Sequence, residues 1–248
     1  MSLSDFAESV PRKTMTLFFI IDTSGSMSGD KIGAVNSAIE EILPELRDMS
    51  DTNADAKIKI AVLEFSSGAE WITSSPIEAE TFSWTFLNAG GVTDLGDACM
   101  KLNEKLSKNE FMKETSGSFA PALFLMSDGE PTDNYQKGLE LLKQNNWFKK
   151  AIKVAVAIGE DANKDVLTEF TGTSEAVLEA YNVALLKKMI KFVSIRASQL
   201  ASKSCNVGVS GNSGGASVVG NKQDDFIDEL EDFKTEIDDS DSDKDVEW

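Results

Sequence analysis

The sequence contains no histidine and only two cysteines, Cys99 and Cys205. Without histidine, the chain cannot supply a Ser-His-Asp or Cys-His nucleophile or a His-ligated metal site. The two cysteines stand alone, so there is no CxxC metal or redox motif. Cys99 falls on an apolar helical stripe, where it is expected to be a small core residue. This cysteine usage is typical of the reducing cytoplasm, which is the localisation we expect.

Long apolar runs and an excess of positive charge are also missing. No apolar stretch approaches membrane-spanning length, and residues 1–13, a predicted flexible lead-in, lack the apolar centre of a secretory signal. The formal net charge is −18; residues 224–248 contribute −11 through 13 Asp and Glu against 2 Lys, which leaves −7 for the rest of the chain. Because the sequence has no basic stripe, we expect neither a nucleic-acid partner nor a membrane partner.

Apolar segments of two kinds alternate along residues 14–202, which we predict to form one domain. Uninterrupted apolar runs predict buried strands, and apolar residues spaced three and four apart predict amphipathic helices. The expected strands cover residues 16–21, 57–65, 70–73, 121–126, 152–158 and 175–178. The expected helices cover residues 30–49, 95–106, 135–142, 164–170 and 183–200. This alternation predicts an α/β fold: a doubly wound, mostly parallel sheet with helices on both faces and one short antiparallel edge strand.

Local signals refine the helices and the end of the chain. Asp30 is a candidate N-cap for the helix that follows it, and Pro44 is expected to kink that helix or to end its regular part. Residues 203–223 are rich in Gly, Ser and Asn and predict a flexible linker. Residues 224–248 predict an acidic, disordered tail; the alternative is an acidic amphipathic helix built on its regularly spaced apolar residues.

Three polar loops follow predicted strands or precede a predicted helix: DTSGS at residues 22–26, GGVT at 90–93 and SDG at 127–129. In a doubly wound sheet, ligands bind at the carboxyl ends of the strands where the strand order reverses, so we expect these loops to converge. A divalent ion would remove the repulsion between two facing carboxylates, and hydroxyl and carboxylate oxygens suit Mg²⁺, Mn²⁺ or Ca²⁺. The candidate metal ligands are Asp22, Ser24, Ser26, Thr93 and Asp128.

Together these loops resemble the metal-ion-dependent adhesion site (MIDAS) of von Willebrand factor A (VWA) domains. The DxSxS pattern of residues 22–26, Thr93 in a GGxT stretch and Asp128 after a strand are all present in the expected order. The resemblance covers roughly residues 15–200. It implies the Rossmann-like VWA fold with Mg²⁺ as the bound ion, and Mn²⁺ or Ca²⁺ as alternatives.

The resemblance also implies a role for each residue. Ser24 and Ser26 bind the ion directly through their hydroxyls, and Thr93 binds it directly or through water. Asp22 and Asp128 act mainly through water and through hydrogen bonds that orient the serines. Because its nearest ligands are neutral, the ion keeps much of its positive charge and favours an Asp or Glu of a protein partner at its open position. This implies a protein-interaction module with no catalytic residue, and not an enzyme.

A narrower resemblance concerns residues 124–133, FLMSDGEPTD. This stretch is similar to the corresponding stretch of bacterial TerY-like proteins, which are associated with tellurium resistance and stress signalling. It implies a cytoplasmic scaffold or regulator that assembles with kinase and phosphatase partners. Other intracellular members of the family serve MoxR-type or chelatase-type AAA+ ATPases, which are the alternative partners.

The metal-site interpretation has alternatives. Taken singly, each of the five residues has a plainer role as a helix cap or a turn residue. A phosphotransferase of the haloacid dehalogenase type also starts from an aspartate after its first strand, but it needs a second acid two residues later, where this chain has Ser24. Glu130 and Asp133 are expected at the rim of the site or as caps. A last hypothesis is that a carboxylate of residues 224–247 occupies the open metal position and inhibits partner binding.

Overall fold

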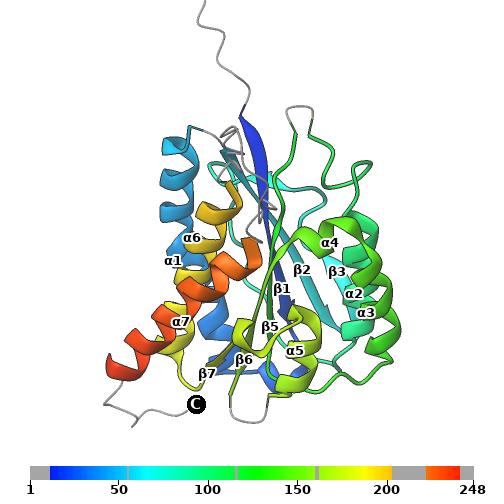
Figure 1. The fold of residues 1–248 in the computed structure, drawn as a ribbon. Helices are drawn as coiled ribbons and strands as arrows, with labels where there is room; N and C mark the ends of the chain where they lie inside the picture. The colour runs from blue at the N-terminus through cyan, green and yellow to red at the C-terminus, as the bar shows by residue number, and fades with distance from the viewer. Residues whose placement is uncertain (1–11, 55, 115–116, 160–161, 203–221, 241–248) are drawn as a thin grey trace, which may run out of the picture.

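The computed structural model describes residues 12–54, 56–114, 117–159, 162–202 and 222–240 of the chain (Figure 1). Its strands are β1 (Lys13–Asp22), β2 (Ala56–Ser66), β3 (Gly68–Trp71), β4 (Ile77–Glu78), β5 (Ala122–Ser127), β6 (Ile152–Ile158) and β7 (Val177–Ala180). Its helices are α1 (Asp30–Thr52), α2 (Leu95–Lys105), α3 (Tyr135–Gln144), α4 (Asn146–Lys150), α5 (Lys164–Thr171), α6 (Val183–Ser202) and α7 (Lys222–Ser240). Two 3₁₀ helices are η1 (Gly25–Met27) and η2 (Ser174–Ala176).

The seven strands form one mostly parallel sheet in the order β3-β2-β1-β5-β6-β7, with β4 pairing to β2. The neighbours among β1, β2, β5, β6 and β7 pair in parallel, whereas β3 and β4 are antiparallel to β2. The predicted fold class is confirmed, including the short antiparallel edge strand. The additional strand β4 was not predicted, because a strand of two residues has no alternation that a sequence pattern can reveal.

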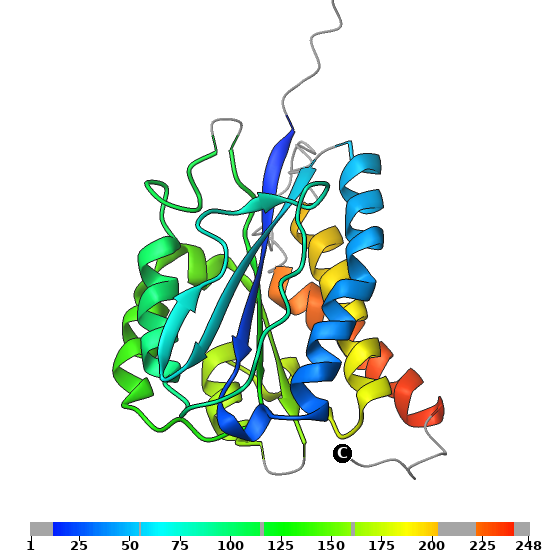
Figure 2. The same cartoon turned by 180° about the vertical axis from the view of Figure 1, so that it is seen from behind.

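Strand β1 is buried on both faces, which is why residues 17–21 form an uninterrupted apolar run. Leu17 and Phe19 belong to the core cluster formed with α1, α6 and α7. Phe18 and Ile20 belong to the cluster formed with α2, α3 and α5. Figures 1 and 2 show these two sets of helices on opposite faces of the sheet.

The strand order reverses at β1, which pairs with β2 on one side and with β5 on the other. The register places Asp22 opposite Phe65 of β2 and Ile21 opposite Met126 of β5. Ser127 and Asp128 therefore continue from β5 beside the end of β1. The carboxyl ends of the parallel strands meet here at a topological switch point, where the sequence pattern placed its polar loops.

The structure bears on two details of the sequence expectation for helix α1. Its N-cap is Gly29, at φ 84°, so Asp30 is the first helical residue and not the cap. Pro44 lies inside a continuous helix and does not end it. Packing explains the continuation, since buried residues such as Leu43 and Leu46 flank the proline. Burial of an apolar face outweighs the loss of one backbone hydrogen bond.

Helix α7 occupies residues 224–240 of the expected disordered tail, where the alternative of an acidic amphipathic helix applies. Its apolar spacing buries Phe226 and Leu230 in the core cluster that α6 also lines. Phe233 stacks on Phe192 of α6, with 3.9 Å between the ring centroids. The disordered-tail prediction is wrong for this segment because the buried apolar stripe compensates the conformational entropy lost on ordering an acidic segment.

Gln223 joins the start of α7 to the sheet. Its side-chain amide accepts a hydrogen bond from the Lys153 N–H at 2.7 Å and donates one to the Lys153 carbonyl at 2.9 Å. Strand β7 leaves this position open, because its pairing with β6 begins at Ala155. Lys222 and Gln223, expected in the linker, thus belong to α7. The rest of the predicted linker and residues 241–248 lie outside the described residues.

The remaining sequence expectations concern Cys99, the lead-in and membrane segments. Cys99 is buried in the core, as predicted, and burial raises the pKa of its thiol to about 12. Cys205 and residues 1–11 lie outside the described part of the chain. Within the described ranges, none of the helices combines the length and the apolar character that crossing a bilayer requires.

Candidate metal-binding site

The first loop of the site leaves β1 at Asp22 and turns into η1. Asp22 Oδ1 accepts a hydrogen bond from the backbone N–H of Ser24 at 2.8 Å, a local turn that aspartate favours. The backbone N–H of Thr23 donates to the carbonyl of Phe65 in β2 at 2.8 Å. These bonds fix the loop to the sheet edge, where Ser24 is buried and Ser26 is exposed.

Two backbone hydrogen bonds join the second loop to the first. The Gly25 N–H donates to the Gly91 carbonyl at 3.1 Å, and the Gly90 N–H donates to the Thr23 carbonyl at 2.8 Å. Gly91 has φ 87°, and a Cβ at this position would lie 2.6 Å from Ser67 Oγ. Glycine is therefore required at position 91 for the close approach of the second loop to the turn between β2 and β3.

Thr93 is held in place through its backbone. Its N–H donates to Thr132 Oγ1 at 3.0 Å, and its carbonyl accepts from the Thr132 N–H at 2.8 Å. The hydroxyl is thus the group that Thr93 brings to the site. Nearby, Asp133 accepts hydrogen bonds from the N–H groups of Gly96 and Asp97, both at 3.1 Å. Asp133 is therefore a cap of α2 supplied by another loop, in line with its predicted role.

Crossed hydrogen bonds join the first and third loops. Ser26 Oγ donates to Asp128 Oδ1 at 2.7 Å. Ser127 Oγ donates to Asp22 Oδ2 at 2.6 Å. The hydroxyl oxygens of Ser24 and Ser26 lie 3.0 Å apart. Each loop therefore orients a side chain of the other, and the two acids face the serines in fixed positions.

Oxygen atoms from the first and second loops surround the space in front of Gly129, which belongs to the third loop. A Cβ at this position would lie 3.5 Å from Ser26 Oγ, 3.6 Å from Thr93 Oγ1 and 3.9 Å from Asp22 Oδ2. Glycine keeps this space open, because a side chain would project toward all three oxygens. The structure thus brings the five candidate residues together, and their role as metal ligands stays a prediction.

The electrostatics of the cluster favour a cation. Asp22 has no exposed surface and Asp128 is only 3% exposed. Burial raises the pKa of Asp22 against the opposing hydrogen bonds from Ser127 and Ser24, and the neighbouring charge of Asp128 raises it further. Buried carboxylates at close range repel one another, and a positive charge between them relieves that repulsion.

Sequence reasoning missed two residues of the cluster, Ser127 and Lys31. Ser127 stands in the predicted SDG loop directly before Asp128 but was not a candidate ligand, and its hydroxyl orients Asp22. Lys31 Nζ lies 2.5 Å from Asp128 Oδ2, the oxygen that Ser26 does not use. A lysine in the first turn of an amphipathic helix is typical of a solvent-exposed face, so the pattern contains no signal for this contact.

The donor set fits a hard divalent cation. Adjacent ligands of an octahedral Mg²⁺, at Mg–O distances of about 2.1 Å, lie about 3.0 Å apart. The two serine hydroxyls are hydrogen-bonded to each other at 3.0 Å, a separation that neighbouring corners of such an octahedron also have. Among the described residues, no group of three or more His, Cys, Asp and Glu side chains is arranged to hold a metal ion. A metal at this edge would therefore rely on hydroxyl as well as carboxylate oxygens.

The fold and the cluster define an α/β domain with a hydroxyl and carboxylate site at its topological switch point. The family model for the von Willebrand factor type A domain matches residues 16–194. The chain belongs to this family.

Two curated relatives share part of the sequence. Inter alpha-trypsin inhibitor heavy chain 4 of Mus musculus is 26% identical over 132 residues, which are 50% of this chain and 13% of the mouse protein. Inter-alpha-trypsin inhibitor heavy chain H4 of Bos taurus is 29% identical over 156 residues, which are 60% of this chain and 15% of the bovine protein. The chain thus spans a small part of the length of these relatives.

Solved structures share the fold at low sequence identity. Proximal thread matrix protein 1 from the mussel byssus matches with a TM-score of 0.56 and 19% identity, over 75% of this chain and 48% of that one. Another structure of the mussel protein, described as having a zinc-occupied MIDAS motif, matches with a TM-score of 0.53 and 16% identity, over 75% and 46%. A von Willebrand factor type A protein from Catenulispora acidiphila matches with a TM-score of 0.55 and 18% identity, over 75% and 43%.

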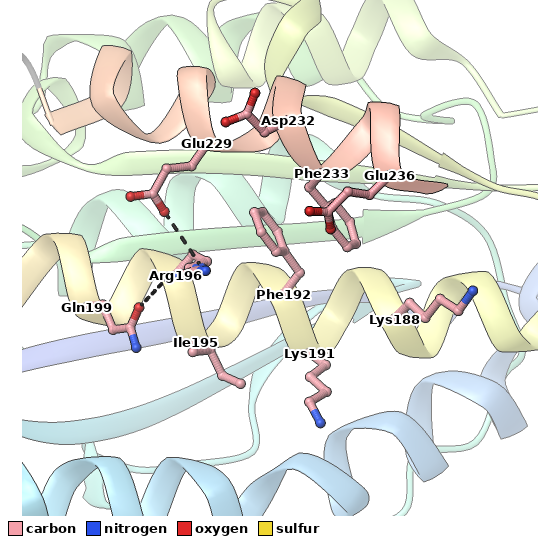
Figure 3. A pocket seen from close by; sticks show the side chains of 10 residues that line it. All are labelled: Lys188, Lys191, Phe192, Ile195, Arg196, Gln199, Glu229, Asp232, Phe233 and Glu236. Carbon is pink, nitrogen blue, oxygen red and sulfur yellow. Dashed lines mark hydrogen bonds and ion pairs between the residues drawn. The ribbon is translucent and has the colours of Figure 1, made fainter. Parts of the chain in front are cut away.

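A second concave region, a groove of 760 Å³, lies between α6 and α7 (Figure 3). The stacked rings of Phe192 and Phe233 lie within it, and Arg196 Nε is 3.8 Å from Glu229 Oε2. None of its lining side chains bears a hydroxyl or belongs to the three loops, so the groove is separate from the candidate metal site. Its charged lining residues are Lys188, Lys191 and Arg196 from α6, and Glu229, Asp232 and Glu236 from α7.

Proposed function

We propose that the chain is a divalent-metal-dependent protein-interaction module, with Mg²⁺ as the ion and an Asp or Glu of a partner protein as the recognised group. The proposal is carried by the convergence of oxygens from Ser26, Thr93 and Asp22 in front of Gly129. When bound, the ion supplies a positively charged open position for a partner carboxylate. The mussel protein with zinc in its MIDAS motif supports the choice of a divalent ion, and Mn²⁺ and Ca²⁺ are alternatives.

The two kinds of residue have different tasks in this proposal. Ser24 and Ser26 would bind the ion directly and Thr93 directly or through water, and all three are neutral. Asp22 and Asp128 hold the ligands in place: Asp22 accepts from the Ser24 N–H, and Asp128 accepts from the Ser26 hydroxyl. Ser26 donates its hydroxyl proton to Asp128 and accepts one from Ser24, so one lone pair of its oxygen remains for a cation. Neutral direct ligands leave the charge of the ion for the partner.

The environment of Asp22 favours binding over catalysis. An aspartate nucleophile needs an accessible oxygen and a neighbouring acid that protonates the leaving group. Asp22 has no exposed surface, and each of its oxygens already accepts a hydrogen bond. Ser24 stands where the haloacid dehalogenase type needs its second acid. We expect no turnover in a phosphatase assay with Mg²⁺; turnover that disappears in Asp22→Asn would support the phosphotransferase alternative.

The finer biological setting rests on the resemblance of residues 124–133 to TerY-like proteins. It supports a cytoplasmic scaffold or regulator in bacterial stress and tellurium-resistance signalling, with kinase and phosphatase partners. A MoxR-type or chelatase-type AAA+ ATPase is the alternative partner. A pull-down from the native cell with Mg²⁺, compared with the same pull-down in excess chelator, identifies the partner and its metal dependence together.

Thermal unfolding of the full chain tests the metal site directly. We expect Mg²⁺ to raise the melting temperature of the wild type and chelator to reverse the rise, because an ion that binds only the folded state stabilises it. Ser24→Ala and Ser26→Ala should keep the fold and lose this response. Ser28→Ala is the matched control, since Ser28 is exposed on the same loop and outside the cluster. An equal response in Ser24→Ala and the wild type would contradict the proposal.

The hypothesis that a carboxylate of the acidic tail occupies the open metal position is best tested on residues 241–248. Residues 222–240 form α7, whose apolar face contributes to the core, so deleting the whole tail would disturb the fold as well as the acids. Changing the acids of residues 241–248 to their amides is the cleaner experiment. If one of these carboxylates competes for the metal, the change raises the affinity for partners; unchanged affinity would remove the hypothesis.

A further inference from the structure

We propose that Lys31 is a built-in counter-ion of the metal site, which weakens binding of the divalent ion and strengthens binding of a carboxylate by the metal-loaded site. This inference rests on the proposed function. Its basis is the ion pair between Lys31 Nζ and Asp128 Oδ2 at 2.5 Å. The Asp128 side chain has no exposed surface, and that of Lys31 is 22% exposed. By comparison, Glu114 is 29% exposed in its pair with Lys59.

The backbone fixes the position of the ammonium group. Lys31 is the second residue of α1, directly after the loop that contains the two serines. The end of its side chain lies against Gly159 after β6, where an added Cβ would be 3.2 Å from both Lys31 Cε and Nζ. Gly159 has φ 87°, and its N–H donates to the Ala180 carbonyl at 2.7 Å. Helix α1, the turn after β6 and the end of β7 thus place the ammonium group of Lys31 beside Asp128.

The ammonium group and the serine use different oxygens of Asp128. Ser26 Oγ donates to Oδ1, and Lys31 Nζ contacts Oδ2. Lys31 therefore compensates the charge of Asp128 without taking over the hydrogen bond that orients Ser26. The hydroxyl and carboxylate cluster stays intact with Lys31 in place, so its effect on an ion is electrostatic.

A fixed positive charge acts in opposite directions on the two binding steps. Asp22 and Asp128 alone have a charge of −2, and Lys31 reduces the total to −1. Adding a divalent ion then makes the total +1, where it would be 0 without the lysine. A site that is less negative binds the cation more weakly, and a loaded site that is more positive binds an anion more strongly. A purely structural lysine would not produce this pair of opposite effects.

The experiment compares Lys31→Met and Lys31→Gln with the wild type, using Mn²⁺ and acetate as probes. Free Mn²⁺ is measured by electron paramagnetic resonance, and acetate binding by the broadening of its proton NMR line by protein-bound Mn²⁺. We expect both variants to bind Mn²⁺ about tenfold more tightly or better, and the Mn²⁺-loaded variants to bind acetate more weakly by a similar factor, because a unit charge within a few ångströms has changed. Lys31→Arg, which keeps the charge, should stay near the wild type.

Lys57→Met is the matched control, since Lys57 pairs with Glu78 near the start of β2, at the opposite end of the strand from the site. Far-UV circular dichroism checks the fold of each variant, and the glutamine variant serves if the methionine variant does not fold. Unchanged Mn²⁺ and acetate affinities, or a loss of both together, would overturn the counter-ion role. Absence of Mn²⁺ binding by the wild type, or equal binding by Ser24→Ala, would instead overturn the proposed function.

Discussion

Two acid-rich regions of this molecule differ in how the fold treats their charge. At the switch point, Asp22 and Asp128 are buried, and every carboxylate oxygen accepts a hydrogen bond or an ion pair from a specific group. On α7, acids such as Asp225, Asp228 and Glu231 are exposed to water. That helix packs on the protein through its apolar side.

The comparison shows that burial and partners matter more than the number of charges. The acidic tail dominates the net charge of the sequence, yet its exposed acids are solvated and screened. The site contributes only two acids, but each must give up hydration in the fold, a cost that proteins accept mainly at functional sites. Substitutions of a buried apolar residue of α7, of a buried acid of the site and of exposed acids of α7 test whether burial matters more than the number of charges.

The largest effect is expected from the apolar side of α7. Leu230→Ala should lower the free energy of unfolding by about 2–5 kcal/mol, because Leu230 is fully buried and its truncation leaves a cavity. Urea unfolding measures the change. Asp228→Ala, on the exposed side of the same helix, is the control and should stay within about 0.5 kcal/mol of the wild type. A small effect of Leu230→Ala would show that α7 is not part of the folding unit.

A smaller effect of opposite sign is expected at the site. Asp22→Asn should raise the free energy of unfolding of the metal-free protein by about 0.5–2 kcal/mol, since it removes a buried charge near Asp128. Because burial raises the pKa of Asp22, the advantage of the variant is present at neutral pH. It should shrink as the pH falls through the pKa of the folded state and vanish below that of the unfolded state.

Thermal unfolding in a series of buffers, with chelator present, measures this pH dependence. The same variant should no longer be stabilised by Mg²⁺. The two measurements together separate the destabilisation caused by the buried charge of Asp22 from its contribution to metal binding. A metal-free Asp22→Asn protein that is less stable than the wild type at neutral pH would mean that the hydrogen bonds of Asp22 outweigh its desolvation.

The smallest effect is expected from the exposed acids of α7. Asp228 and Glu231 are three residues apart on the helix surface, where like charges repel. Changing both to their amides should raise stability by about 0.2–0.5 kcal/mol at low salt. The gain should disappear at about 1 M salt, where the Debye length is about 3 Å. A gain of equal size at both salt concentrations would point to helix propensity and not to charge.

The convergence of the three loops was predictable from the sequence because each loop has a clear local pattern. Each polar loop stands next to a strand or helix with clear periodicity, and the switch-point rule then brings the loops together. The contact between Lys31 and Asp128 was not predictable in this way. It joins residues 97 positions apart, and it depends on how the end of β6 passes beside the first turn of α1.

Apart from the short elements β4 and α4, the fold was predictable for the same reason up to α6, and less so beyond it. Buried strands such as β1 have no competing interpretation, whereas α7 combines an apolar stripe with many acids, and composition alone favoured disorder. What orders α7 is a surface made by distant elements, including Phe192 of α6 and the Lys153 backbone of β6. The prediction that Asp30 is the N-cap of α1 was wrong for a related reason: the glycine before it, at positive φ, takes the cap position.

The double hydrogen bond between Gln223 and Lys153 bears on how the protein should be produced. An expression fragment trimmed to the family match, which ends at residue 194, would cut α6 short and remove the amide that covers this part of β6. The uncovered N–H and carbonyl groups would then be available to a strand of another molecule, the usual first step of edge-to-edge aggregation. Insolubility of such a fragment would therefore reflect where it was cut and not a defect of the native domain.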